Sequence, residues 1–143
     1  MITSLAKFAC AVLLAVATLG AAQGADDATF QGLGGKAGIK KIVAAFIPLI
    51  QADPRIKESF TDIDMKNLAL RLEEQFCVLS GGPCEYKGKD MKEIHDGLNI
   101  TNAQFNALAE DLQVAMDKNG VAPAVQNKLV AKLAPMQKEI VTK

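Results

Sequence analysis

The apolar positions along the chain recur every three or four residues, which is the period of an amphipathic α-helix. Runs that alternate apolar and polar residues, as a half-buried strand would, are absent from the pattern. The clearest apolar stripe lies between residues 65 and 79. The same spacing predicts four substantial helices, over residues 36–52, 65–79, 102–118 and 124–141. The pattern therefore predicts an all-α protein with a single domain.

Turn and capping residues divide the chain between these helices. Pro48 and Pro135 fall inside the first and last helix, and each predicts a bend because proline removes a backbone hydrogen bond and clashes with the preceding turn. Thr101 and Gln104 have the spacing of a capping box, which predicts the start of the third long helix. Residues 25–29 are polar, and we expect them to be frayed.

The single histidine of the chain lies in a short helical segment between the second and third long helices. Met91, Ile94 and His95 share one face of this segment, and Gly97 is suited to close it. A lone histidine on a half-apolar face is often a packed residue, but neutral imidazole is also the commonest metal ligand in proteins. One histidine cannot build a zinc site, which needs three or four protein ligands. It can hold a haem iron, because the porphyrin supplies four further ligands. The spacing leaves packing and ligation both open.

The first 24 residues have the outline of a secretory signal peptide. Lys7 precedes an apolar run over residues 8–19, and Ala22 and Gly24 are small enough for a cleavage site. The apolar run is short for a membrane span. We expect residues 1–24 to be removed, leaving a domain of residues 25–143 that is periplasmic or secreted and has no membrane span. An uncleaved anchor is the alternative.

The net charge limits the possible binding partners, and the cysteines bear on the cellular compartment. Removing residues 1–24 takes one lysine away and leaves 15 basic against 16 acidic residues, with no basic stripe for nucleic acid. Cys77 and Cys84 flank a flexible Gly-Gly-Pro turn, and export would expose them to an oxidising compartment. We expect a disulfide that stabilises the fold by about 2–3 kcal/mol. Two unlinked thiols are the alternative.

A set of motifs between residues 30 and 140 resembles the group 1 truncated haemoglobins in order and in spacing. The motifs are Gly34-Gly35, Phe46, Ala52-Asp53-Pro54-Arg55-Ile56, Gly81-Gly82-Pro83, Tyr86-Lys87-Gly88-Lys89-Asp90-Met91, His95-Asp96-Gly97-Leu98-Asn99-Ile100-Thr101 and Ala134-Pro135-Met136. Each motif alone is weak, whereas their succession is specific. The resemblance implies a two-over-two helical sandwich around haem b, and it favours the ligand interpretation of His95.

The resemblance also implies roles for individual side chains around the haem. His95 would be the proximal iron ligand, Arg71 would pair with a haem propionate, and Tyr86 would lie near the haem edge. Solvent exposure of Arg71 and a loop-anchoring role for Tyr86 are the alternatives. The remaining contacts implied are Phe46, Leu68 and Leu72 on the distal side, Phe76 on an apolar gas tunnel, and Leu98 and Phe105 on the proximal side.

This chain departs from the best-known members of the family on the distal side of the haem. Ile47 stands where they carry a tyrosine, and Leu72 stands where they carry a glutamine, with Leu68 one turn earlier. Gln75 is the nearest polar side chain on that helical face. A hydrogen bond to a charged group contributes about 1.5–3 kcal/mol. Without that donor, O₂ should leave roughly 10–100 times faster than from a tyrosine-bearing relative.

Three functions from different classes follow from these expectations. The first is a monomeric or weakly dimeric gas-binding or gas-sensing globin that holds O₂, CO or NO. The second is a haem enzyme, either an NO dioxygenase served by an unknown reductase or a weak peroxidase. Peroxidase chemistry usually needs a distal acid–base group, which the sequence does not supply. The third is a haem-free helical binding protein in which His95 only packs.

Overall fold

The computed structural model describes residues 25–143, so the predicted signal peptide over residues 1–24 lies outside the described residues. Within residues 25–143 the chain forms α-helices and 3₁₀ turns without strands, which confirms the all-α class. An isolated parallel bridge joins Ile100 to Val141. None of the helices in this part of the chain combines the length and the apolarity that crossing a membrane requires.

The helical elements follow the predicted order closely. They are α1 (Ala25–Gly32), α2 (Gly35–Ala52), η1 (Lys57–Phe60), α3 (Met65–Leu79), α4 (Met91–His95), α5 (Asn102–Lys118), α6 (Pro123–Leu133), η2 (Ala134–Met136) and α7 (Gln137–Ile140). The ends of α3 and α5 are those predicted, and α2 begins one residue before the predicted start. Local capping explains this agreement: Asp64 accepts from Lys66 N at 3.0 Å, and Thr101 and Gln104 form a complete capping box.

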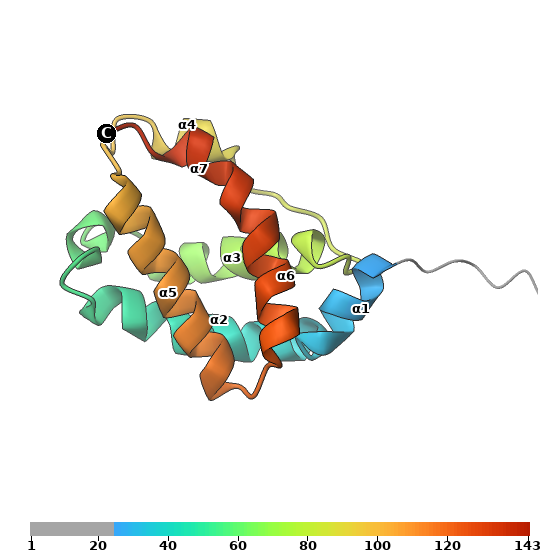
Figure 1. Ribbon diagram of the computed structural model, residues 1–143. Coiled ribbons are helices and arrows are strands. Elements are labelled where there is room, and N and C mark those ends of the chain that lie inside the picture. The colour runs from blue at the N-terminus through green and yellow to red at the C-terminus, as the bar shows by residue number, and fades with distance from the viewer. Residues whose placement is uncertain (1–24) are drawn as a thin grey trace, which may run out of the picture.

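The last helix differs from its prediction. The bend predicted at Pro135 is confirmed, but a single helix over residues 124–141 is wrong, because α6 ends at Leu133 and Pro135 lies in the 3₁₀ turn η2. The proline ring has no N–H to donate to the preceding turn, and the chain tightens there before α7 begins. Pro48, by contrast, lies inside α2, which continues to Ala52. The break at Pro135 lets α7 lie beside α4 (Figure 1).

The beginning of the described chain is also more regular than expected. Residues 25–29, predicted to be frayed, belong to α1. Phe30 and Leu33 are buried in the core, and the Phe30 N–H donates to the Ser80 carbonyl at 3.0 Å. Burial of these two side chains and a hydrogen bond to a distant turn hold the helix, and neither is visible in the local composition.

The long helices form two layers. Figure 1 shows α5 and α6 crossing in front of α2 and α3, with α2 packed against both α3 and α5. The core between the layers is apolar. Its largest fully buried side chains include Phe46, Phe76, Met116 and Leu129. Each such side chain contributes about 1.5–3 kcal/mol by leaving water. This arrangement confirms the two-over-two sandwich and leaves the short α4 at one end of it.

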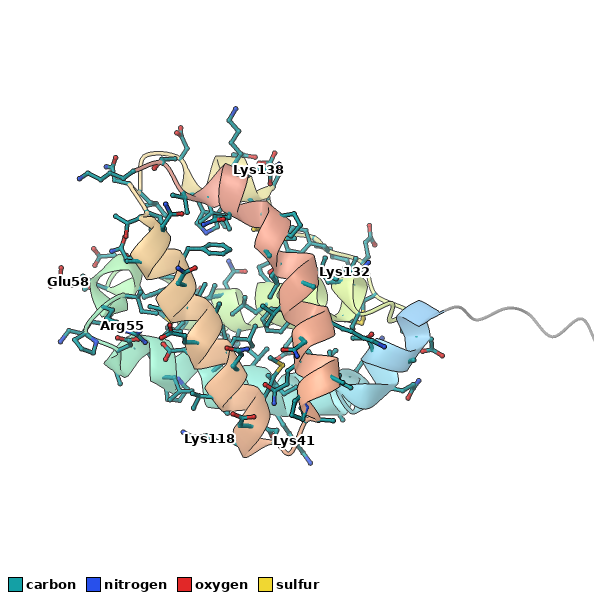
Figure 2. The ribbon with its side chains drawn as sticks, viewed as in Figure 1. Lys41, Arg55, Glu58, Lys118, Lys132 and Lys138 are labelled. Atoms are coloured by element: carbon teal, nitrogen blue, oxygen red, sulfur yellow. A yellow bond between two sulfur atoms is a disulfide. The ribbon has the colours of Figure 1, made fainter. Side chains whose placement is uncertain are left out.

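A buried acidic side chain lies where α5 meets the end of α2. Asp111 is 8% exposed, and its Oδ2 has no hydrogen-bond partner among the described residues. Its neighbour Asp53 accepts from the Arg55 N–H at 2.8 Å and from the guanidinium at 2.7 Å. Arg55, which lies at the edge of the molecule in Figure 2, also pairs with Glu110. Burial raises the pKa of Asp111, and the charge of Asp53 raises it further.

We predict that Asp111 makes the stability of the fold fall as the pH rises. The unfolded carboxyl titrates near pH 3.9, whereas the folded one keeps its proton to a higher pH, so the folded state is penalised above that value. Asp111→Asn should remove the penalty. The difference in unfolding free energy between variant and parent should grow by up to about 1.4 kcal/mol per pH unit until the folded pKa is passed.

Urea unfolding of parent and variant between pH 4 and 8, starting just above the pKa of the unfolded carboxyl, measures this difference. Asp53 has the opposite effect on stability, because its hydrogen bonds to Arg55 lower the pKa of Asp53. The stabilisation that Asp53 contributes is lost only below its unfolded pKa, in more acidic solution than the experiment uses, so it does not interfere. Asp62→Asn is the control, since the Asp62 side chain is exposed and takes no part in the ion pairs around Asp111, so its neutralisation should leave the pH slope unchanged. A constant difference between Asp111→Asn and parent at every pH would refute the prediction.

Candidate functional site

A cavity of about 230 Å³ lies between the two helix layers and α4. A single water molecule needs about 10–15 Å³ on the same scale, so the cavity can hold a much larger ligand. Its walls are mainly apolar, which suits a ligand with a large apolar surface. The side chains that line it come from α2, η1, α3, α4, α5, the three C-terminal elements and the segments that connect these helices.

His95 lines this cavity from the last turn of α4. The helix begins at Asp90, whose side chain accepts from the Glu93 N–H at 2.7 Å, and it ends just before Gly97, whose φ of 74° closes it. The His95 Nδ1–H donates to the Met91 carbonyl at 2.7 Å. A carbonyl can only accept, so the proton is on Nδ1, and in the neutral imidazole that metal ligation requires the lone pair is on Nε2. The imidazole is therefore in the tautomer that binds a metal through Nε2.

Large apolar side chains around His95 remain uncovered by the protein. Ile94 is 45% exposed, Leu98 is 49% exposed and Ile63 is 44% exposed. All three line the cavity. Apolar side chains gathered around one concave site mark a binding surface, whereas scattered ones do not. A broad apolar ligand placed against His95 would cover them.

Polar groups gather at one part of the cavity wall. Arg71 Nη1 lies 2.6 Å from Glu74 Oε2, and the same oxygen accepts from the Lys87 N–H at 3.0 Å. The N–H of Lys87 and the charge of Arg71 hold the pKa of Glu74 below its ordinary value. The Tyr86 hydroxyl donates to the Lys89 carbonyl at 2.8 Å, and burial raises its pKa. The wall thus carries a cation and a protonated phenol, and a carboxylate lies directly behind the cation.

A disulfide joins this part of the wall to α3. The structure links Cys77, which is 2% exposed, to Cys84, seven residues further on. Between Cys84 and α4 the chain has no helix or strand, and it carries Tyr86. The cross-link therefore shortens the free segment that leads to the helix bearing His95.

We predict that replacing both cysteines by alanine lowers the free energy of unfolding by about 2.5 kcal/mol, from the loop-closure entropy of an eight-residue loop. Urea unfolding of parent and double variant measures the loss. A thiol reductant should destabilise the parent by a similar amount and leave the double variant unchanged. Equal stability of oxidised and reduced parent would contradict the prediction.

Comparison with known proteins decides the family. A family model described as bacterial-like globin matches residues 28–142. A group 1 truncated haemoglobin from Tetrahymena pyriformis is 33% identical over 114 residues, which cover 80% of this chain and 94% of that protein. Another from Tetrahymena thermophila is 36% identical over 96 residues, covering 67% of this chain and 79% of the relative. The Fe(III) crystal structure of the Tetrahymena pyriformis protein superposes with a TM-score of 0.78, covering 80% of this chain and 98% of that one.

The chain belongs to the group 1 truncated haemoglobins. It is accordingly a haem-binding globin, and the residues around the cavity fit that group. The single imidazole has its Nε2 lone pair free, the walls are apolar, and uncovered side chains surround His95. A cationic Arg71 lies on the same wall, which suits a ligand that also carries carboxylates.

The cavity beside His95 is lined by nearly all the side chains that the sequence analysis assigned to the haem site. Those that line it are Phe46, Leu68, Arg71, Leu72, Gln75, Phe76, Tyr86, His95, Leu98 and Phe105. Ile47 is the exception, because it packs partly buried against the core and is not among the lining residues. On α2 the lining residues are Phe46 and Ile50, one turn apart, and Ile47 lies about 100° around the helix from Phe46. On α2 the cavity is therefore lined by Ile50 beside Phe46, and the distal role of Ile47 stays a prediction.

The structure shows the orientation of the Gln75 side chain, which the sequence left open. Its Nε2 donates to the thioether sulfurs of Met91 at 3.4 Å and Met136 at 3.6 Å. Gln75 thereby links α3 to α4 and η2. Thioether sulfur is a weak acceptor, so these contacts hold the amide loosely.

Several further side chains line the truncated haemoglobin cavity without having been assigned to it from the sequence. They are Ile50, Ile56, Ser59, Phe60, Ile63, Met91, Ile94, Ile100, Gln104, Leu108, Ala109, Leu133, Met136 and Ile140. Met91 and Ile94 could have been found, because they share the helical face of His95. Leu133 and Ile140 belong to a visible apolar stripe, but a stripe does not tell a cavity wall from a packed core. Nothing in the sequence pattern marked Ser59 or Phe60 as a cavity-lining residue.

Proposed function

We propose that this truncated haemoglobin holds haem b through His95 and reversibly binds the diatomic gases O₂, CO and NO. The observation that carries the proposal is the hydrogen bond from His95 Nδ1 to the Met91 carbonyl, which leaves Nε2 free beside an apolar cavity. Haem supplies the iron at which such gases bind. The carbonyl fixes the orientation of the imidazole and raises its basicity, as second partners of ligating histidines do.

The cavity walls determine how the site treats different gases. Leu68 and Leu72 line the cavity with hydrocarbon side chains and offer no donor. The Gln75 amide already donates to the sulfurs of Met91 and Met136, and the Tyr86 hydroxyl already donates to the Lys89 carbonyl. A gas that gains most from a hydrogen bond therefore gains little here, so the site discriminates weakly in favour of O₂ over CO and NO.

We also propose that the protein acts in the periplasm or outside the cell, after removal of residues 1–24. Two features support this location: the signal-like composition of those residues, and the disulfide between Cys77 and Cys84. Disulfides persist in oxidising compartments and are rare in the cytosol.

Reconstitution with haem tests the proposed function. The chain from Ala25 onward should take up one equivalent of haem, and its reduced absorption spectrum should change reversibly with O₂, CO or NO. Exchange of the gas phase for argon should remove O₂ quickly. The proposal would be overturned if haem uptake did not saturate at one equivalent, or if none of the three gases changed the absorption spectrum.

A further inference from the structure

Glu74 lies beside the cavity, and its carboxylate holds two parts of the wall at once. Its Oε2 accepts from Arg71 Nη1 at 2.6 Å and from the backbone N–H of Lys87 at 3.0 Å. Arg71 belongs to α3 and lines the cavity, while Lys87 follows the cavity-lining Tyr86 in the segment before α4. Glu74 itself is not among the lining residues. It therefore acts on the cavity through its neighbours.

The ion pair is partly shielded from solvent. The Arg71 side chain is 25% exposed and the Glu74 side chain is 16% exposed. Such a pair is less screened than one on the open surface, and charge-assisted hydrogen bonds are the stronger kind. Arg71 uses only Nη1 within the described residues, although a guanidinium has five N–H donors. The cation can therefore serve a second anion while Glu74 holds it.

Arg71 is the only lysine or arginine among the cavity-lining residues of the described chain. Haem carries two carboxylates on an otherwise apolar ring, and this guanidinium is the cation the cavity offers them. We propose that Glu74 is a positioning residue of the haem site: it fixes Arg71 and the Tyr86 segment, and it competes with the haem carboxylates for the Arg71 cation. The proposal rests on the proposed function, because it needs haem in this cavity.

Two substitutions separate the two effects of Glu74. Glu74→Gln keeps a side-chain oxygen for the Lys87 N–H but removes the negative charge, so Arg71 becomes fully available to a carboxylate. Glu74→Ala removes the oxygen as well and releases the segment that carries Tyr86. The first variant should hold haem more tightly than the parent, and the second should hold any porphyrin less tightly.

The experiment compares haem with haem dimethyl ester, which lacks the two negative charges. The rate of transfer to excess apomyoglobin is measured for each. Glu74→Gln should slow the loss of haem by roughly 2–5-fold and leave the loss of the ester unchanged. Arg71→Met should speed the loss of haem and cancel the effect of Glu74→Gln in the double variant. Glu73→Gln removes the same charge one residue earlier, where the described structure shows no ion pair, and should change neither rate.

A second readout needs no bound haem. In the haem-free protein, hydrogen exchange of the Lys87 amide should accelerate in Glu74→Ala and stay near the parent rate in Glu74→Gln. If Glu74→Gln shifts haem and ester loss equally, or shifts neither, the proposal is overturned while the assignment of His95 stands. If the parent binds neither porphyrin, the proposed function fails and this inference fails with it.

Discussion

Replacing His95 by alanine should abolish histidine ligation and lower the affinity for haem by at least about 100-fold. The loss should exceed the roughly 10–100-fold that removal of an outer partner of a metal ligand causes. No second histidine can take its place, because the chain contains a single histidine. Titration of haem into parent and variant, followed by absorption spectroscopy in both oxidation states, measures the affinity and the ligation together.

The glycine variant provides the matched control for this experiment. His95→Gly leaves a space where the imidazole stood, so added imidazole should restore the parental spectrum if the fold is intact. Met91→Leu retains the backbone carbonyl that accepts from His95 Nδ1 and should keep histidine ligation. A His95→Ala protein that retains the parental spectrum and affinity would remove His95 from the site.

Replacing Leu72 by glutamine should slow the dissociation of O₂ by roughly 10–100-fold relative to the parent. Leu72 lines the cavity from α3, so an amide at this position can donate into a wall that now carries only hydrocarbon there. A hydrogen bond to a charged group contributes about 1.5–3 kcal/mol, and each 1.4 kcal/mol is a factor of ten in rate. Stopped-flow displacement of O₂ by CO measures the rate.

CO provides the internal control for Leu72→Gln, because it gains less from a donor and its dissociation should change much less than that of O₂. Leu72→Met provides the steric control, since it alters the shape of the side chain without adding a donor. If Leu72→Gln and Leu72→Met release O₂ at the same rate, the hydrocarbon wall is not what sets the rate.

The elements that could be predicted from the sequence are those fixed by local chemistry. The stripe of α3 and the capping groups at Asp64 and Thr101 specify where helices begin without reference to the rest of the fold. The short helix before Gly97 could be predicted for the same reason, because a glycine with positive φ ends it. A role as metal ligand could be inferred for His95 only from the order of the surrounding motifs, because residue spacing alone was compatible with both packing and ligation.

The parts that could not be predicted depend on contacts between distant residues. Pro135 ends α6 but Pro48 does not end α2, and the two prolines look alike in sequence. Ile47 follows a cavity-lining residue, yet it packs partly buried against the core and is not itself a lining residue. Glu74 pairs with both Arg71 and Lys87 and so joins α3 to a segment without regular structure. A contact of this kind cannot be predicted from hydrophobic periodicity.

The central claim is that His95 Nε2 binds the iron of a haem held in the apolar cavity. The most direct test is resonance Raman spectroscopy of the reduced, ligand-free protein prepared with natural and with ¹⁵N-labelled histidine. Because the chain has one histidine, any band that shifts reports on His95 alone. The account predicts a low-frequency iron–imidazole stretching band that moves down on labelling. A haem-loaded protein whose low-frequency spectrum is identical in both preparations would contradict it.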